Sequence, residues 1–156
     1  MNWNDKIQVK KGDIGQEIVR EILEEGGLIV YEPKTNGAHW FDFVATRNKK
    51  EIFFIDVKTK ARFNNWEAQG IDVKHYEDYM RLINQFNLPF FLFFVDDKNG
   101  DVHVANLKEL KKPIQQPNEN IIAWSIHEML RVRQLDSETI KQLSALDSRN
   151  YKYNPK

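Results

Sequence analysis

Residues 41–58 have the sequence FDFVATRNKKEIFFIDVK, in which two runs of β-forming residues flank the polar segment Asn48-Lys49-Lys50. Runs of this kind on either side of a short polar turn predict a β-hairpin, with strands at about 40–47 and 51–59. The position of the turn then decides which residues face each other across the hairpin.

The register of this hairpin follows if the chain reverses at Lys49. Arg47 then lies opposite Glu51, and opposite charges in directly facing positions stabilise a strand pair. The same register places Asp42 opposite Asp56, with their Cβ atoms about 4.5–5.5 Å apart. The hairpin therefore predicts two neighbouring carboxylates.

These two carboxylates need a partner. Directly opposed like charges destabilise a sheet, and the apolar neighbours of Asp42 and Asp56 disfavour their charged forms. A shared cation or a bound proton relieves that cost, and Mg²⁺ is commonly held by one or two carboxylates together with waters and substrate phosphates. We therefore interpret the pair as a divalent-cation site. The alternative is that both are strand-end charges satisfied by each other and by solvent.

Lys58 extends the pattern. Side chains alternate along a strand, so Asp56, Lys58 and Lys60 share one face of the hairpin. An ammonium group two residues beyond a metal-binding carboxylate can offset negative charge that develops during a reaction.

The rest of the chain reads as a mixed sheet covered by helices. Asp13 is a candidate N-cap for a helix at 14–25, which Gly26-Gly27 ends. Asp72 is a candidate cap for a helix up to about residue 87. Further strands are expected at 28–31, 90–95, 101–105 and 121–125, the last of them at an edge of the sheet. Residues 63–70 have no regular pattern. Residues 106–112 are expected to form a helical turn, and the C-terminal part is expected to be mostly helical, including residues 136–146. This order predicts one α/β domain over residues 1–150, with core motifs in 10–96, followed by a frayed tail at 151–156.

The amino-acid composition excludes several classes of functional site. The 156 residues include 23 basic and 23 acidic side chains and no cysteine. Disulfide frameworks, thiolate zinc sites and cysteine nucleophiles are thereby excluded, and a strongly basic nucleic-acid footprint is absent. Residues 47–62 nevertheless carry a local excess of four positive charges. We find neither a membrane-spanning run nor a secretory signal pattern, so we expect a cytoplasmic protein that does not enter a membrane.

The motif residues resemble the PD-(D/E)XK nuclease superfamily. Asp42, the turn-containing spacer and Asp56-Val57-Lys58 match its core motif, although Phe41 stands at the position of the name-giving proline. Glu17 matches the frequent upstream acid. The context Gly12-x-x-Gly15-x-Glu17 and the Asn36-Gly37 pair are most similar to the Holliday junction resolvase branch. The resemblance implies a restriction-endonuclease-like fold: a mixed β-sheet core flanked by helices.

The resemblance also implies a mechanism, in-line hydrolysis of a DNA phosphodiester with Mg²⁺, for which Mn²⁺ would substitute. The implied metal ligands are three carboxylates and one backbone carbonyl: Asp42, Asp56, Glu17 and Val57. Lys58 would orient or activate the attacking water, and Gln69 would support Lys58 or contact a phosphate.

The function implied is a metal-dependent DNA endonuclease of the resolvase or restriction type. Basic residues beside the motif are candidate DNA contacts: Lys49, Lys50, Lys60 and Arg62. A homodimer and partner proteins of a recombination or restriction system are consistent with such an enzyme. Two alternatives stay open: a non-catalytic DNA-binding or assembly module of the same fold, and a phosphoryl hydrolase acting on a small substrate. Trp66 is either a stacking contact for DNA or part of a small core.

Overall fold

The computed structural model describes residues 7–63, 65–115 and 118–146. Its regular elements are, in chain order, α1 (Ile7–Glu25), β1 (Ile29–Tyr31), β2 (Phe43–Arg47), β3 (Glu51–Thr59), β4 (Ala68–Asp72), α2 (Val73–Phe86), β5 (Phe90–Val95), β6 (Asp101–Asn106), β7 (Ile121–Ser125), a short 3₁₀ helix (Ile126–Glu128), β8 (Leu130–Gln134) and α3 (Ser137–Ala145).

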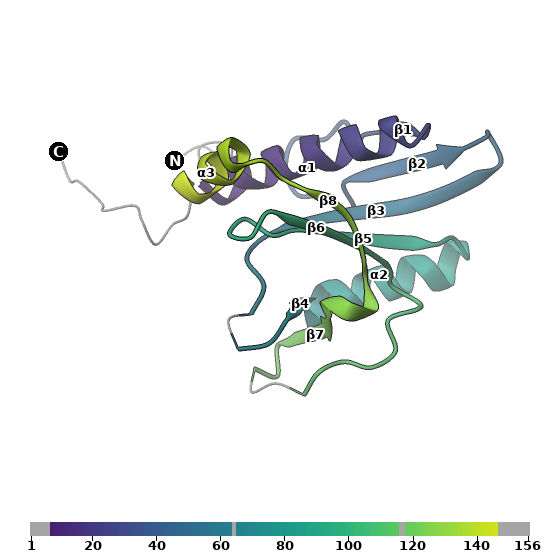
Figure 1. Ribbon diagram of the computed structural model, residues 1–156. Helices are drawn as coiled ribbons and strands as arrows, with labels where there is room; N and C mark the ends of the chain where they lie inside the picture. The colour runs from purple at the N-terminus through teal and green to yellow at the C-terminus, as the bar shows by residue number, and fades with distance from the viewer. Residues whose placement is uncertain (1–6, 64, 116–117, 147–156) are drawn as a thin grey trace.

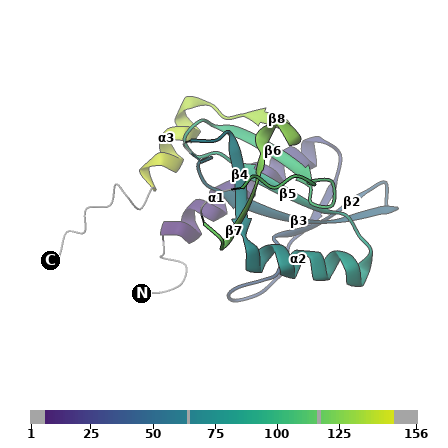
Figure 2. The same cartoon turned by 90° about the horizontal axis from the view of Figure 1, so that it is seen from below.

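A mixed six-stranded sheet forms the middle layer, in the order β1-β2-β3-β5-β6-β8. Only β3 and β5 are parallel to each other; the other neighbouring strands are antiparallel. Helices α1 and α3 cover one face, while α2 and the small β4–β7 sheet cover the other (Figures 1 and 2). The predicted fold class, a mixed α/β sheet flanked by helices, is confirmed.

The β2–β3 hairpin has the predicted register, which runs from Phe43 opposite Ile55 to Arg47 opposite Glu51. Its turn is tight: the Lys50 amide donates to the Arg47 carbonyl at 3.1 Å, and the two residues between them have positive φ angles. Asp42 lies immediately before β2 rather than inside it, because the strand begins at Phe43 and not at residue 40. Its amide still donates to the Ile55 carbonyl at 3.0 Å, which continues the ladder toward Asp56.

Strand β5 passes through the centre of the sheet and is buried over nearly its whole length, as its continuous apolar sequence Phe90–Val95 predicts. It pairs in parallel with β3, placing Asp56 beside Leu92 and Lys58 beside Phe94. The connection between the two strands runs through β4 and α2. The motif strand is thus held in the interior of the sheet.

Helix α1 is longer than predicted. Its described part starts at Ile7, so the assignment of Asp13 as N-cap is wrong: Gly12 and Asp13 lie inside the helix. An interior glycine costs a helix about 1 kcal/mol, and tertiary contacts such as the ion pair between Lys11 and Asp97 offset that cost. Gly15 lets the helix approach β3 closely, since a Cβ there would lie 1.8 Å from Thr59 Oγ1.

The C-terminal part differs most from the prediction. Part of the segment expected to be irregular forms β4, which pairs with β7 in a separate two-stranded sheet. The predicted strand at 121–125 is therefore present, but outside the main sheet. Strand β8 was not predicted and forms the true edge beside β6. Helix α3 begins as expected, with the Asp136 carboxylate accepting from the Thr139 amide at 2.7 Å.

None of the helices in the described part of the chain is long and apolar enough to cross a bilayer. The predicted tail at 151–156 lies outside the described residues.

Candidate active site

A cavity of about 700 Å³ opens where α1, the loop before β2 and the middle of β3 meet. That volume is typical of ligand-binding sites. Its lining comes from three parts of the fold: Gln8, Gly12 and Gln16 on α1, Asn36 to His39 in the loop, and Asp42, Asp56, Val57 and Lys58 on or beside the hairpin. The cavity therefore collects most of the residues that the motif predicts.

Asp42 is buried and fixed by three donors. The Val57 amide donates to its Oδ2 at 2.7 Å, and the Gln16 amide group donates to its Oδ1 at 2.8 Å. His39 Nε2 lies 3.0 Å from the same Oδ1. These contacts come from a helix, a loop and the neighbouring strand, so the carboxylate orientation is set by the tertiary fold.

Asp56 is also buried, next to Lys58 and Tyr79. Lys58 Nζ lies 2.9 Å from Asp56 Oδ2 and 5.7 Å from the centre of the Tyr79 ring. The ammonium group of Lys58 thus neutralises part of the charge on the buried Asp56 carboxylate. Burial, followed by the charge and the hydrogen bond of Asp56, raises the pKa of Tyr79 well above its ordinary value. The phenol therefore stays protonated and can donate to Asp56.

The two carboxylates interact electrostatically, as the hairpin register predicts. Burial and then the negative charge of Asp56 raise the pKa of Asp42 from 3.8 to about 6, against the lowering effects of the Val57 amide, His39 and Lys58. At pH 7 and above, Asp42 is mostly ionised and the fold holds two close negative charges. A site of this kind favours a cation.

The donor set fits a divalent cation that retains other ligands. No group of three or more His, Asp or Glu side chains arranged to hold a metal occurs in residues 7–63, 65–115 and 118–146. The chain thus offers two buried carboxylates, Asp42 and Asp56, at one cavity. Mg²⁺ is often bound in this way, with waters and substrate phosphates completing its coordination.

Glu17 does not reach this cavity. Its side chain is 63% exposed and lies 3.3 Å from Arg20 Nε, and it is absent from the cavity lining. Gln16 occupies the place near Asp42 that the resemblance assigns to Glu17. The reason is rotational: the buried face of α1 is centred on Gly15 and Val19, so position 17 points away from the sheet.

Gln69 is buried, but it contacts the backbone rather than Lys58. Its amide nitrogen lies 3.3 Å from the Lys60 carbonyl oxygen, and its Oε1 has no partner among the described residues. In this geometry Gln69 supports the exit of β3.

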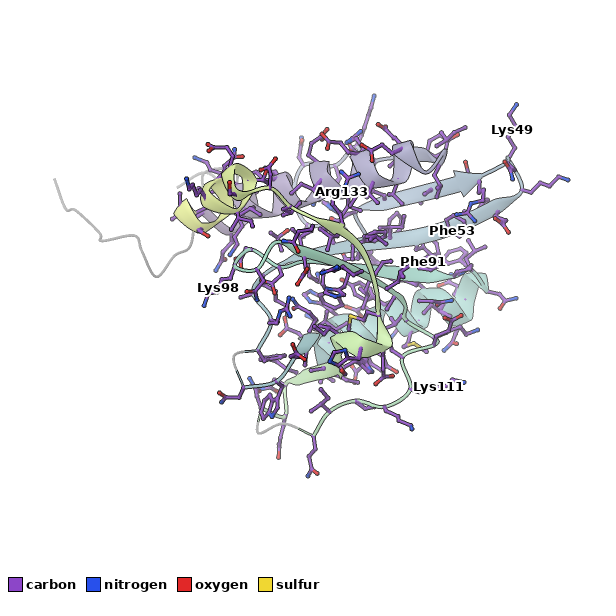
Figure 3. The ribbon with its side chains drawn as sticks, in the orientation of Figure 1. Lys49, Phe53, Phe91, Lys98, Lys111 and Arg133 are labelled. Atoms are coloured by element: carbon purple, nitrogen blue, oxygen red, sulfur yellow. The ribbon has the colours of Figure 1, made fainter. Side chains whose placement is uncertain are left out.

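The four predicted DNA contacts separate into different regions. Lys49 and Lys50 lie in the turn between β2 and β3, roughly 17 Å or more from Asp56 at about 3.3 Å per strand residue. Figure 3 shows Lys49 at the tip of the hairpin. Arg62 is tied to Asp96 and Asp101. Lys60 stays near the site, and burial and then the charge of Lys58 lower its pKa to about 8.

Three residues of the site were not predicted from sequence: Gln16, His39 and Tyr79. Gln16 carries a weak signal, since Gln8, Gly12 and Gln16 recur every four residues and so line one side of a helix. His39 and Tyr79 carry none, because their roles depend on contacts between distant elements.

Comparison with protein-family models and with curated proteins gives no match. Among solved structures, the fold is similar to that of Hjc, a Holliday junction resolvase from the archaeal hyperthermophile Archaeoglobus fulgidus. The TM-score is 0.57 at 13% sequence identity, with 78% of this chain and 96% of Hjc covered. At this identity the likeness establishes the fold: a mixed α/β domain of the Hjc resolvase type.

Proposed function

We propose that this protein is a metal-dependent DNA endonuclease of the PD-(D/E)XK type, resolvase-like or restriction-like in its action. The observation that carries the proposal is the Asp42–Asp56 pair beside Lys58. Both carboxylates are buried, the negative charge of Asp56 helps to raise the pKa of Asp42, and the Lys58 ammonium group lies 2.9 Å from Asp56 Oδ2. The similarity to Hjc supports DNA as the substrate.

The chain's own residues have distinct tasks in this proposal. Gln16, His39 and the Val57 amide hold Asp42 in one orientation, which spares the site reorganisation during the reaction. A divalent cation held by the two carboxylates supplies Lewis-acid polarisation of the scissile phosphate. Lys58 orients the attacking water or offsets charge on the phosphate oxygens. The carbonyl of Val57 stays a candidate further ligand.

Asp42 must be ionised for this arrangement to bind a cation. Because its pKa is about 6, protons compete with the metal below that value, and metal affinity falls as the pH is lowered. Cleavage of both DNA strands requires two such sites, so we expect the active species on duplex or junction DNA to be a two-fold symmetric dimer.

A cleavage assay with matched variants tests the proposal. The purified chain is incubated with supercoiled, linear, single-stranded and four-way-junction DNA, in Mg²⁺, in Mn²⁺ and in EDTA. Asp56→Asn and Lys58→Met remove the proposed chemistry with little change in volume. Asp78→Asn, on the outer surface of α2 next to Arg81, is the matched control.

We expect cleavage in Mg²⁺ or Mn²⁺ by the wild type and by Asp78→Asn, and a loss of at least about 100-fold in Asp56→Asn and Lys58→Met. Cleavage that persists in EDTA, or in Asp56→Asn, contradicts the proposal. DNA binding without cleavage under every metal condition favours the alternative, a non-catalytic module of the same fold.

A further inference from the structure

Two depressions meet over the loop that follows β3. Each has a volume of about 310 Å³, and both are lined by Ala61, Arg62, Phe63 and Lys98. Because they share these residues, the two depressions adjoin; we call them together the loop groove, which residues 61–63 and 65–67 line along the loop.

The loop groove lies next to the candidate active site. Lys60, at one end of the groove, is two residues beyond Lys58 of the site. Lys11, at the same end, lies on α1 between Val9 and Gly12, which line the active-site cavity. The groove is therefore close enough to the carboxylate pair to hold the part of a DNA strand that adjoins a phosphate bound there.

Hydrogen bonds hold the described residues on both sides of the groove loop. Arg62 Nε donates to the fully buried Asp96 at 2.7 Å, which ties the loop to the β5–β6 turn. Within the loop, the Phe63 amide donates to the Ala68 carbonyl at 3.1 Å, and the Ala68 amide to the Trp66 carbonyl at 2.7 Å. A groove built on such a loop is preorganised for a ligand.

The groove contains positively charged lysines that have no carboxylate partner in the described part of the chain. In the described part of the chain, neither Lys60 nor Lys98 forms an ion pair with a carboxylate, whereas Lys11 pairs with Asp97. Lys98 is exposed and lies at the end of the sheet opposite to Lys49 (Figure 3). Two carboxylates also line the groove, but each has a partner: Asp97 pairs with Lys11, and Glu67 lies 2.9 Å from His127 Nε2. Lys60 and Lys98 can therefore contact the phosphates of a bound strand.

The far part of the groove adds an aromatic surface. The Trp66 side chain lines the groove and is 38% exposed. The Phe63 ring supports it, with ring centres 6.2 Å apart at an angle of 64°. An exposed indole beside cationic groups is the usual platform for stacking nucleic-acid bases.

We propose that the loop groove binds an unpaired DNA strand adjoining the cleaved phosphodiester, with phosphates near Lys60 and Lys98 and a base stacked on Trp66. This inference rests on the proposed nuclease function and narrows its substrate to DNA with a single-stranded segment, such as a tail, a flap or an open junction.

An unpaired strand fits better than a continuous duplex for two reasons. Bases within a duplex are already stacked on each other, so Trp66 has no free base face to cover. In addition, the chain has no net charge, so binding that depends on many phosphate contacts is disfavoured, whereas stacking depends little on charge.

Fluorescence anisotropy in EDTA tests the groove separately from cleavage. The labelled probes are a short oligothymidylate, a blunt hairpin duplex, and the same duplex with a single-stranded tail. The variants are Trp66→Ala, Trp66→Phe and Lys98→Glu. Lys111→Glu, another exposed lysine placed away from the groove (Figure 3), is the control. Thermal melts check that each variant is folded.

We expect Trp66→Ala to weaken binding of the oligothymidylate and the tailed duplex by roughly 5- to 100-fold and to leave blunt-duplex binding unchanged. Trp66→Phe should retain most of the affinity, because it keeps an aromatic ring. Lys98→Glu should weaken tail binding, and Lys111→Glu should not. With two phosphate contacts, log K against log salt should have a slope of roughly −1.4.

Three results overturn the groove assignment: no binding of unpaired strands by the wild type, equal affinity for blunt and tailed duplexes, or unchanged binding by Trp66→Ala. The nuclease proposal fails separately. If Asp56→Asn cleaves as well as the wild type while Trp66→Ala loses tail binding, the groove stands and the catalytic assignment falls. If Asp56→Asn abolishes cleavage while Trp66→Ala changes neither cleavage nor tail binding, the catalytic assignment stands and the groove assignment falls.

Discussion

Replacing Asp42 by asparagine should make the metal-free protein more stable at neutral pH. The reason is that the fold holds the Asp42 carboxylate buried and beside Asp56, which favours the protonated form. Asparagine keeps the shape and the ability to accept from the Val57 amide, and it carries no charge. The substitution thus removes a cost that a catalytic site bears for its function.

The size of the effect follows from the pKa of Asp42. Its rise from 3.8 to about 6 is roughly 2 pKa units, which corresponds to about 3 kcal/mol. The native carboxyl binds its proton more tightly than the unfolded one, so this stabilisation is complete below about pH 4 and is lost as the pH rises through 6. The difference in unfolding free energy between variant and wild type should therefore grow by up to about 3 kcal/mol between pH 4 and pH 7.5.

Urea unfolding in EDTA at several pH values measures this difference. Titrating groups distant from Asp42 cancel in the comparison, and the hydrogen bonds that asparagine fails to make shift the curve by a constant. Adding Mg²⁺ at 100 times its dissociation constant should then stabilise the wild type by about 2.7 kcal/mol and leave Asp42→Asn unchanged. A difference that stays constant with pH would refute the reasoning, since it would mean that neither burial nor the charge of Asp56 raises the pKa of Asp42.

Three substitutions test the supports of the site. Gly15→Ala should cost about 1–3 kcal/mol in unfolding free energy, because its Cβ meets β3; thermal melts measure this. Arg62→Met should cost roughly 3 kcal/mol or more, because the buried Asp96 loses its cation; urea unfolding measures this. Gln16→Ala should weaken Mn²⁺ binding in calorimetry, because Asp42 loses an orienting donor.

Each of these has a matched control in the same part of the fold. Gly12→Ala should be neutral or stabilising, since nothing lies within 4 Å of a Cβ there. Arg131→Ala should change stability little, because that side chain is 63% exposed. Glu17→Ala should leave Mn²⁺ binding intact. Equal effects in a substitution and its control would count against the corresponding contact, and loss of binding in Glu17→Ala would restore Glu17 as a ligand.

The centre of the fold was predictable because its signals are local. The charged pair of Arg47 and Glu51 across a short polar turn specifies the hairpin register, and the unbroken apolar run at 90–95 specifies a strand buried on both faces. These two features are enough to place Asp42 near Asp56, and the raised pKa of Asp42 agrees with that placement.

Other elements were missed where the local signal is short or ambiguous. Strand β8 alternates apolar and charged residues from Leu130, a strand pattern that is only five residues long and follows a helical turn. Strand β4 contains Gly70, which lowers its apparent strand propensity, yet the glycine is needed because a Cβ would lie 2.5 Å from the Ile122 carbonyl.

The surroundings of the carboxylates depend on contacts between distant parts of the chain. Gln16 is 26 positions from Asp42, and the choice between Gln16 and Glu17 depends on the rotation of α1 against the sheet. A stripe through Ile14, Ile18 and Ile22 makes Glu17 a plausible neighbour of the core, whereas the buried face centred on Gly15 and Val19 excludes it. The packing of the helix against the sheet decides which of the two side chains reaches Asp42, and the spacing of residues along the sequence does not encode that packing.

The most direct measurement is a calorimetric titration of the metal-free protein with Mn²⁺ at pH 7.5, repeated with Asp42→Asn, Asp56→Asn and Lys58→Met. We predict saturable binding in the wild type and in Lys58→Met, and loss of binding in both aspartate variants, since the carboxylates hold the cation and the ammonium group does not. Binding that survives in Asp42→Asn and Asp56→Asn, or no binding by the wild type, would contradict the assignment of the pair as a metal site.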